Sequence, residues 1–164
     1  MNIAPRAGLL TLFLAAVVPA QAADNPMIER LATCQDSWFE WKSSDPARLQ
    51  QFVAGFQSDF SQKERGPFFV PKSSQTVIGP VAQVFPQSVG MAVGFSVVVN
   101  ATFDQTRTSL ERRIGKSIKK CEPPSDNMRT CELEIGAKKT MVLMAEDNAK
   151  STTTLFGCYY FYEK

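Results

Sequence analysis

The sequence predicts an α+β fold, with an N-terminal helical pair packed with a third helix on a mostly antiparallel sheet of about five strands. Apolar residues recur at intervals of three and four between residues 26 and 60, which is the spacing of amphipathic helices. After residue 76, several stretches alternate in the manner of strands. The chain also has four cysteines, an even number that favours disulfides in an oxidising compartment. We therefore expect a disulfide-stapled α+β domain.

Residues 1–22 have the pattern of a cleavable signal peptide. Arg6 is followed by an apolar run from Ala7 to Val18 and then by the small-residue triplet Ala20-Gln21-Ala22. This run is shorter than the roughly 20 residues that a membrane-spanning helix needs, and an Ala-x-Ala ending is typical of signal peptidase sites. We expect cleavage after the triplet and a single exported α+β domain at residues 23–164.

Two antiparallel helices are expected to open this domain. For the first, Asn25 suits the cap and Pro26 the first turn. One apolar stripe continues along it through Met27, Leu31, Cys34, Trp38 and Trp41. The second helix is expected to begin after Asp45, with Pro46 in its first turn. Its stripe consists of Leu49, Phe52, Val53, Phe56 and Phe60.

The next two segments predict strands. Thr76–Phe85 is rich in β-forming residues but is interrupted by Gly79-Pro80, so we expect an edge or bulged strand at the border of the sheet. Within Val89–Val99, large side chains alternate with small ones. The large side chains are expected to face the core, and a helix is expected to pack on the small ones.

A third helix and three further strands complete the expected fold. Thr102 and Gln105 form a capping-box pattern, and Gly115 suits a left-handed C-terminal cap. Three segments after it predict strands, namely 130–135, 140–145 and 152–162. The last of these has aromatic residues on both sides, so we expect a central core strand; if one side were bare, its tyrosines would form a recognition patch.

Of the three possible cysteine pairings we favour Cys34 with Cys158 and Cys121 with Cys131. The first would tie the N-terminal helix to the last strand, and the second would close a short segment rich in turn residues. Within that segment two prolines and the disulfide would hold four residues in a preordered projection, which lowers the entropy lost on binding. These candidate partner-binding residues are Asp126, Asn127, Met128 and Arg129.

The composition excludes several classes of function. A formal net charge of +2 over 164 residues leaves no basic footprint for nucleic acid or an anionic membrane. No apolar run after residue 22 is long enough for a membrane span. Histidine is absent, which removes the commonest general base and metal ligand. We therefore expect no metal, no cofactor and no enzymatic activity.

Three hypotheses of function follow. The favoured one is an exported periplasmic protein that binds and inhibits a protein partner, as an immunity protein does when it neutralises a toxin that attacks the cell envelope. The second is a periplasmic binder of small molecules or envelope polymers, with an apolar cavity lined by Trp38, Phe52 or Phe95. The third, ranked last, is a hydrolase that uses Glu132 and Glu134, which alternate on one strand at a separation of roughly 7 Å.

Overall fold

The computed structural model of this chain describes residues 26–37, 40–41, 44–62, 69–71, 76–89, 92–148 and 150–161. The expected signal peptide at residues 1–22 lies outside the described residues. So do Asn25 and Trp38, which belong to the pattern of the first expected helix.

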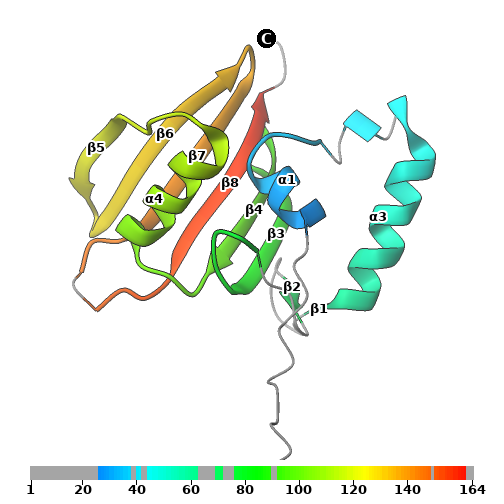
Figure 1. Ribbon diagram of the computed structural model, residues 1–164, viewed down its shortest axis with the longest axis horizontal. Coiled ribbons are helices and arrows are strands. Elements are labelled where there is room, and N and C mark those ends of the chain that lie inside the picture. The colour runs from blue at the N-terminus through cyan, green and yellow to red at the C-terminus, as the bar shows by residue number, and fades with distance from the viewer. Residues whose placement is uncertain are drawn as a thin grey trace, which may run out of the picture.

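The described strands form one antiparallel sheet of eight strands in the order β1-β2-β3-β4-β8-β7-β6-β5 (Figure 1). Their bounds are β1 Phe60–Gln62, β2 Phe69–Pro71, β3 Val81–Val89, β4 Ala92–Val99, β5 Lys120–Ser125, β6 Met128–Gly136, β7 Lys139–Glu146 and β8 Thr154–Phe161. The chain runs β1 to β4 as one meander and β5 to β8 as another. The two meanders join where β8 pairs with β4, with Cys158 opposite Phe95.

The α+β class is confirmed, but the expected count of about five strands is too low. β1 and β2 have three residues each, too few for an alternating pattern to be visible in the sequence. β5 contains Pro123 and Pro124, so the sequence indicated a loop there. Because β5 is the outermost strand in the sheet order, prolines that cannot donate hydrogen bonds are tolerated in it.

The described helices are α1 Pro26–Ala32, α3 Pro46–Asp59 and α4 Phe103–Ile114. Figure 1 shows α1 and α4 over the same face of the sheet, with α3 to the side of α1. The core lies between this face and the helices. Its largest fully buried side chains include Phe95, Phe156, Ile28, Leu31, Leu110, Ile118, Met141 and Leu143.

The expected first helix is too long, because α1 ends at Ala32 and not near Trp41. Cys34 has a left-handed backbone with φ 62°, which ends the helix as the cysteine turns toward its disulfide partner. A new helical turn then starts at Ser37, whose Oγ accepts a hydrogen bond from the Glu40 N–H at 3.1 Å. Ser37 and Glu40 have the spacing of a capping box, a signal that the apolar stripe concealed.

The other two helices begin where the sequence predicted. At α3, the Asp45 carboxylate accepts the Arg48 N–H at 3.0 Å, and Phe52 packs edge-on against Phe95, with ring centroids 6.1 Å apart. At α4, the capping box of Thr102 and Gln105 is confirmed, and Gly115 is the left-handed C-terminal cap with φ 67°.

Two expectations about the β3–β4 region are wrong. The strand at Val81–Val89 does not border the sheet, because the short β2 pairs with it on the far side. Its register does shift between Val81 and Gln83, as expected of a bulged strand. No described helix packs on the small residues of β4. The ring of Tyr159 fills that space: a Cβ on Gly94 would lie 2.6 Å from its Cδ1.

The structure contains two disulfides, and they join the cysteines that the sequence favoured. Cys34 is bonded to Cys158 and Cys121 to Cys131. No cysteine of the described residues is free. The first disulfide fixes the segment after α1 to the central strand β8, and the second joins β5 to β6. Two disulfides indicate an oxidising compartment.

Candidate protein-interaction surface

One face of the sheet is not covered by a described helix. Along β7, Met141, Leu143 and Ala145 are buried on the helix side, whereas Thr140, Val142 and Met144 alternate with them and are half-buried. β8 shows the same alternation. Because successive side chains of a strand point to opposite faces, the half-buried set belongs to the side away from α1 and α4. We call this side the open face.

The register places the open-face residues in three adjacent rows across the sheet. The first row, from β5 to β3, is Glu122, Thr130, Met144, Leu155, Val98 and Gln83. The second, from β5 to β3, is Lys120, Glu132, Val142, Gly157, Ser96 and Phe85. The third, from β6 to β4, is Glu134, Thr140, Tyr159 and Gly94.

The centre of the open face is formed by Tyr159 together with two glycines, Gly94 and Gly157. The Tyr159 ring covers Gly94, and its hydroxyl is 2.8 Å from the Ser96 Oγ. Ser96 is in turn completely buried against Gly157, where a Cβ would lie 2.7 Å from the Ser96 Cα. Tyr159 itself stays half-buried. A surface with a tyrosine at its centre and apolar side chains around it is typical of the core of a protein–protein interface.

Charge is distributed unevenly on the open face. By the register, its described residues include four carboxylates, Glu122, Glu132, Glu134 and Glu146, but a single ammonium, that of Lys120. Lys120 pairs with Glu132 at 3.4 Å. The face is therefore acidic, although the whole chain has a formal net charge of +2. The four carboxylates lie on β5, β6 and β7, beside the apolar side chains of β7, β8 and β4.

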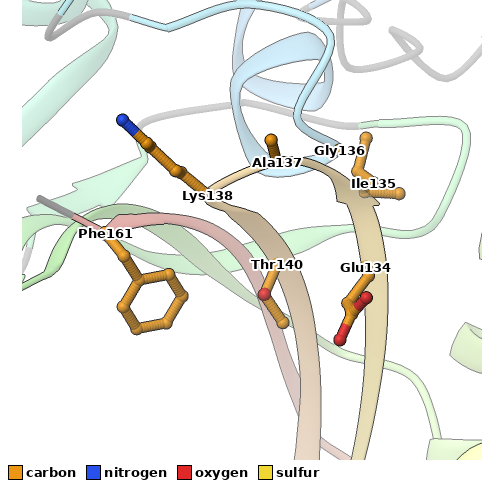
Figure 2. Close-up of a pocket in the computed structure, with 7 residues that line it drawn as sticks. All are labelled: Glu134, Ile135, Gly136, Ala137, Lys138, Thr140 and Phe161. Atoms are coloured by element: carbon orange, nitrogen blue, oxygen red, sulfur yellow. The ribbon is translucent and has the colours of Figure 1, made fainter. Parts of the chain in front are cut away.

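An open pocket lies at the end of this face, around the turn between β6 and β7. Its lining residues are Glu134, Ile135, Gly136, Ala137, Lys138, Thr140 and Phe161 (Figure 2). The Phe161 N–H donates to the Lys138 carbonyl at 3.0 Å, which holds the 47% exposed ring next to the turn. Glu134 and Thr140 are directly opposite each other in the register, and the Lys138 side chain extends away from both (Figure 2).

The four residues expected to bind a partner do not form one surface. Asp126 and Asn127 have φ 49° and 59° and form the tight turn between β5 and β6, where both are exposed. Met128 is opposite Glu146 and belongs to the end of the open face. Arg129 points to the helix side, so only the turn and Met128 are placed near the open face.

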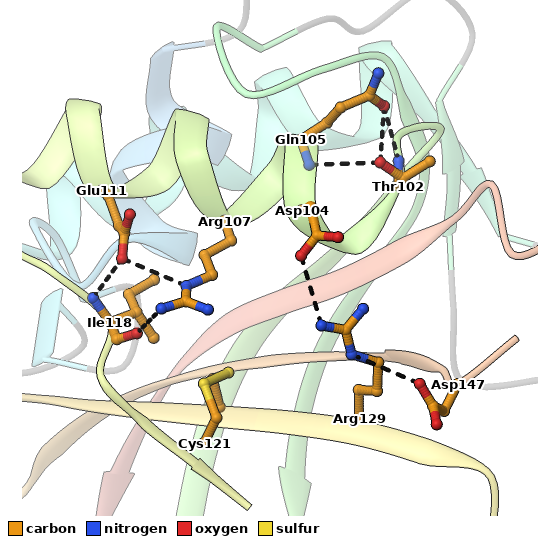
Figure 3. Close-up of polar contacts among 10 residues, drawn as sticks. Thr102, Asp104, Gln105, Arg107, Glu111, Ile118, Cys121, Arg129 and Asp147 are labelled. Carbon is orange, nitrogen blue, oxygen red and sulfur yellow. Dashed lines mark hydrogen bonds and ion pairs between the residues drawn. A yellow bond between two sulfur atoms is a disulfide. The ribbon is translucent and has the colours of Figure 1, made fainter. Parts of the chain in front are cut away.

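Arg129 braces α4 against the sheet (Figure 3). Its guanidinium carbon lies 4.3 Å from the centroid of the Phe103 ring. Its nitrogens are 3.5 Å from the Asp104 carboxylate and 3.6 Å from that of Asp147. The disulfide of Cys121 lies close by on the same side, and these contacts give Arg129 a structural role.

Two arginines of α4 make contacts within the fold. Arg113 pairs with the carboxylate of Glu29, which is only 3% exposed and also accepts the Val77 N–H at 2.9 Å. Arg107 donates to the Ile118 carbonyl at 2.7 Å. These contacts join α4 to α1 and to the segment after the helix.

The residues expected to serve a hydrolase or a small-molecule binding protein are placed as follows. Glu132 and Glu134 lie on one face as predicted, with Glu132 in the ion pair to Lys120. Phe52 and Phe95, expected to line an apolar cavity, are buried and in ring contact with each other. Trp38 lies outside the described residues. Two sequence signals pointed to the open face: the alternation in the segment 130–135, and the alternative in which tyrosines on a bare side of the last strand form a recognition patch. The favoured interpretation of those aromatic residues was core.

The described residues include neither a membrane-spanning helix nor a metal-binding cluster. No described helix has the length and apolar character needed to cross a membrane. No group of three or more histidine, cysteine, aspartate or glutamate side chains in this part of the chain is arranged to hold a metal ion.

Comparison with known proteins gives no match to a family model, to a curated protein or to a solved structure. Function must therefore be argued from the geometry of the open face.

Proposed function

We propose that this chain is an exported, periplasmic binding protein that inhibits another protein, and that it acts as an immunity protein against a toxin directed at the cell envelope. The observation that carries this proposal is the open face, with its central tyrosine and apolar rows. A sheet face with this composition offers a partner the aromatic and methionine side chains that protein interfaces favour.

The compartment is argued from the sequence together with the disulfides. Residues 1–22 have the pattern of a signal peptide, and disulfides such as Cys34–Cys158 persist outside the reducing cytoplasm. The Cys34–Cys158 bond holds the helix side of β8, so the open face rests on a cross-linked central strand. A rigid surface loses little conformational entropy on binding, which suits a tight inhibitor.

The proposal is tested with a periplasmic toxin encoded beside the gene. Cells that receive the toxin are given either the full chain or a variant without residues 1–22. We expect protection from the full chain alone, because an immunity protein must meet the toxin in the compartment where the toxin acts. Equal protection without export, or no protection at all, would contradict the proposal.

The surface is tested in the same cells and with the purified proteins. Met144→Glu places a charge in the first row of the open face and is expected to weaken toxin binding at least about tenfold. Val53→Glu is the matched control, because Val53 is a 42% exposed apolar side chain on α3. Loss of affinity with Val53→Glu but not with Met144→Glu would show that the partner binds elsewhere.

A further inference from the structure

We propose that the partner binds the open face through a basic surface, and that an arginine side chain of this partner occupies the pocket formed by Glu134, Thr140 and Phe161. This inference rests on the proposed function for the existence of a protein partner. It goes further in naming the chemistry of that partner and the residue that anchors it.

The charge of the open face selects a basic partner. Its described carboxylates are those of Glu122, Glu132, Glu134 and Glu146, and its one described ammonium, on Lys120, already pairs with Glu132. Glu134 is exposed and makes no ion pair to another described residue. Complementary charge around an apolar centre accelerates association and excludes partners of the wrong sign. The complementary surface has an apolar middle and cations at its rim.

The pocket has the groups that recognise a guanidinium. The Glu134 carboxylate can accept two parallel hydrogen bonds from arginine, which is the strongest pairing of this kind. The exposed ring of Phe161 offers a face for a cation–π contact, and the Thr140 hydroxyl is an additional acceptor. In Figure 2, Glu134, Thr140 and Phe161 surround the same opening, while the Lys138 ammonium extends away from it. A single arginine side chain fits this set of groups.

The same charges argue against a second copy of the chain as the occupant. Two open faces placed against each other would bring the carboxylates of β6 and β7 into one interface. Like charges in a desolvated interface cost free energy and suppress the wrong pairing. Sedimentation of the purified protein should therefore give a monomer, and a dimer that Met144→Glu dissociates would overturn the inference.

The pocket is tested first without any partner. The probe is the blocked tripeptide Ac-Ala-Arg-Ala-NH2, titrated into ¹⁵N-labelled protein and followed through the backbone amide signals. We expect shifts concentrated at Glu134, Thr140 and Phe161. Ac-Ala-citrulline-Ala-NH2, which has nearly the same shape but no charge, should shift these signals at least about fivefold less.

Two variants assign the effect to this pocket. Glu134→Gln keeps the size of the side chain and should weaken the arginine probe at least about fivefold. Glu146→Gln removes the same charge from the same face at the other end of β7, and should leave binding within about twofold because surface charges at that distance are screened. Equal loss in both variants, or equal binding of arginine and citrulline, would overturn the pocket.

The toxin assay separates this inference from the proposed function. Protection that survives Glu134→Gln, with no response to the tripeptide, would overturn the arginine pocket and leave the inhibitor proposal standing. Selective arginine binding at Glu134 without protection against any toxin would support the pocket and contradict the inhibitor proposal. Charge reversal by Glu134→Arg should abolish protection if both are right.

Discussion

The two disulfides should differ in how much they stabilise the protein. Cys34 and Cys158 are separated by 124 residues in the chain, and Cys121 and Cys131 by 10. A cross-link stabilises largely by restricting the unfolded chain, in proportion to the logarithm of the loop that it closes. This gives about 5 kcal/mol for the long loop and about 3 kcal/mol for the short one.

Burial adds to the difference. Cys158 is fully buried and Cys34 is 7% exposed, so alanine at both positions leaves unfilled space in the core. Cys131 is also buried, at 1% exposure, but Cys121 is exposed, so alanine at these two positions leaves less unfilled space than alanine at Cys34 and Cys158. The double variant C34A/C158A is thus expected to lose at least about 5 kcal/mol, which is comparable with the total stability of a small domain.

The measurement is equilibrium unfolding in urea, followed by the fluorescence of the buried Trp41. Each double variant, C34A/C158A or C121A/C131A, is compared with the unchanged protein in buffer without added oxidant or reductant. Trimethylamine N-oxide at one fixed concentration, which favours the compact state, keeps the weaker variant folded. Equal losses in the two variants, or a larger loss for C121A/C131A, would refute the argument from loop length and burial.

Three further predictions concern single residues. Thr106 has a buried hydroxyl without a hydrogen-bond partner among the described residues, so Thr106→Val should raise the free energy of unfolding by about 1 kcal/mol in urea denaturation, whereas a loss would show that the hydroxyl is satisfied. Gly94→Ala should lower the free energy of unfolding by about 1 to 3 kcal/mol because the new Cβ meets the Tyr159 ring. Gly136→Ala is the control: no atom lies within 4 Å of its new Cβ, so the free energy of unfolding should change by less than about 0.5 kcal/mol. Burial raises the pKa of Tyr160 to about 12. Since this tyrosine ionises near pH 10 in the unfolded chain, the stability of the protein should fall as the pH rises from about 10 to about 12. A Tyr160→Phe variant whose stability depends equally steeply on pH would contradict this.

The sequence predicted the features that depend on local pattern. The limits of α4 follow from Thr102, Gln105 and Gly115, which act within one or two turns of the backbone. The start of α3 follows from Asp45 in the same way. For the cysteines, the choice among three pairings rested on the short spacing of Cys121 and Cys131, and it agrees with the structure.

Features that depend on distant contacts were not predictable. Asp36, which follows α1, accepts hydrogen bonds from Arg30 and Arg48, both at 2.7 Å, and the Tyr160 hydroxyl donates to its carbonyl at 2.7 Å. These contacts and the disulfide of Cys34 end α1 at Ala32, although the apolar spacing of the sequence continues to Trp41.

The open face was equally hidden. An alternating strand shows that one face is buried, but not what covers the other. That Tyr159 would lie over Gly94 depends on the pairing of β8 with β4, and these strands are far apart in the sequence. The pocket forms only when β6, β7 and β8 are neighbours, which brings together Glu134, Thr140 and Phe161. No local sequence motif could therefore predict it.

The place of β8 in the sheet also sets the order in which the protein can fold. β8 comes last of the described strands in the chain, yet it pairs with both β4 and β7 and joins the two meanders. When the chain emerges with its N-terminus first, the two meanders therefore cannot be joined until β8 has emerged. During that interval Cys34 can meet Cys121 and Cys131 before its own partner, and a chain with the wrong disulfide must be reshuffled before the sheet closes. Folding speed should then depend on disulfide exchange, and a thiol–disulfide isomerase should accelerate it.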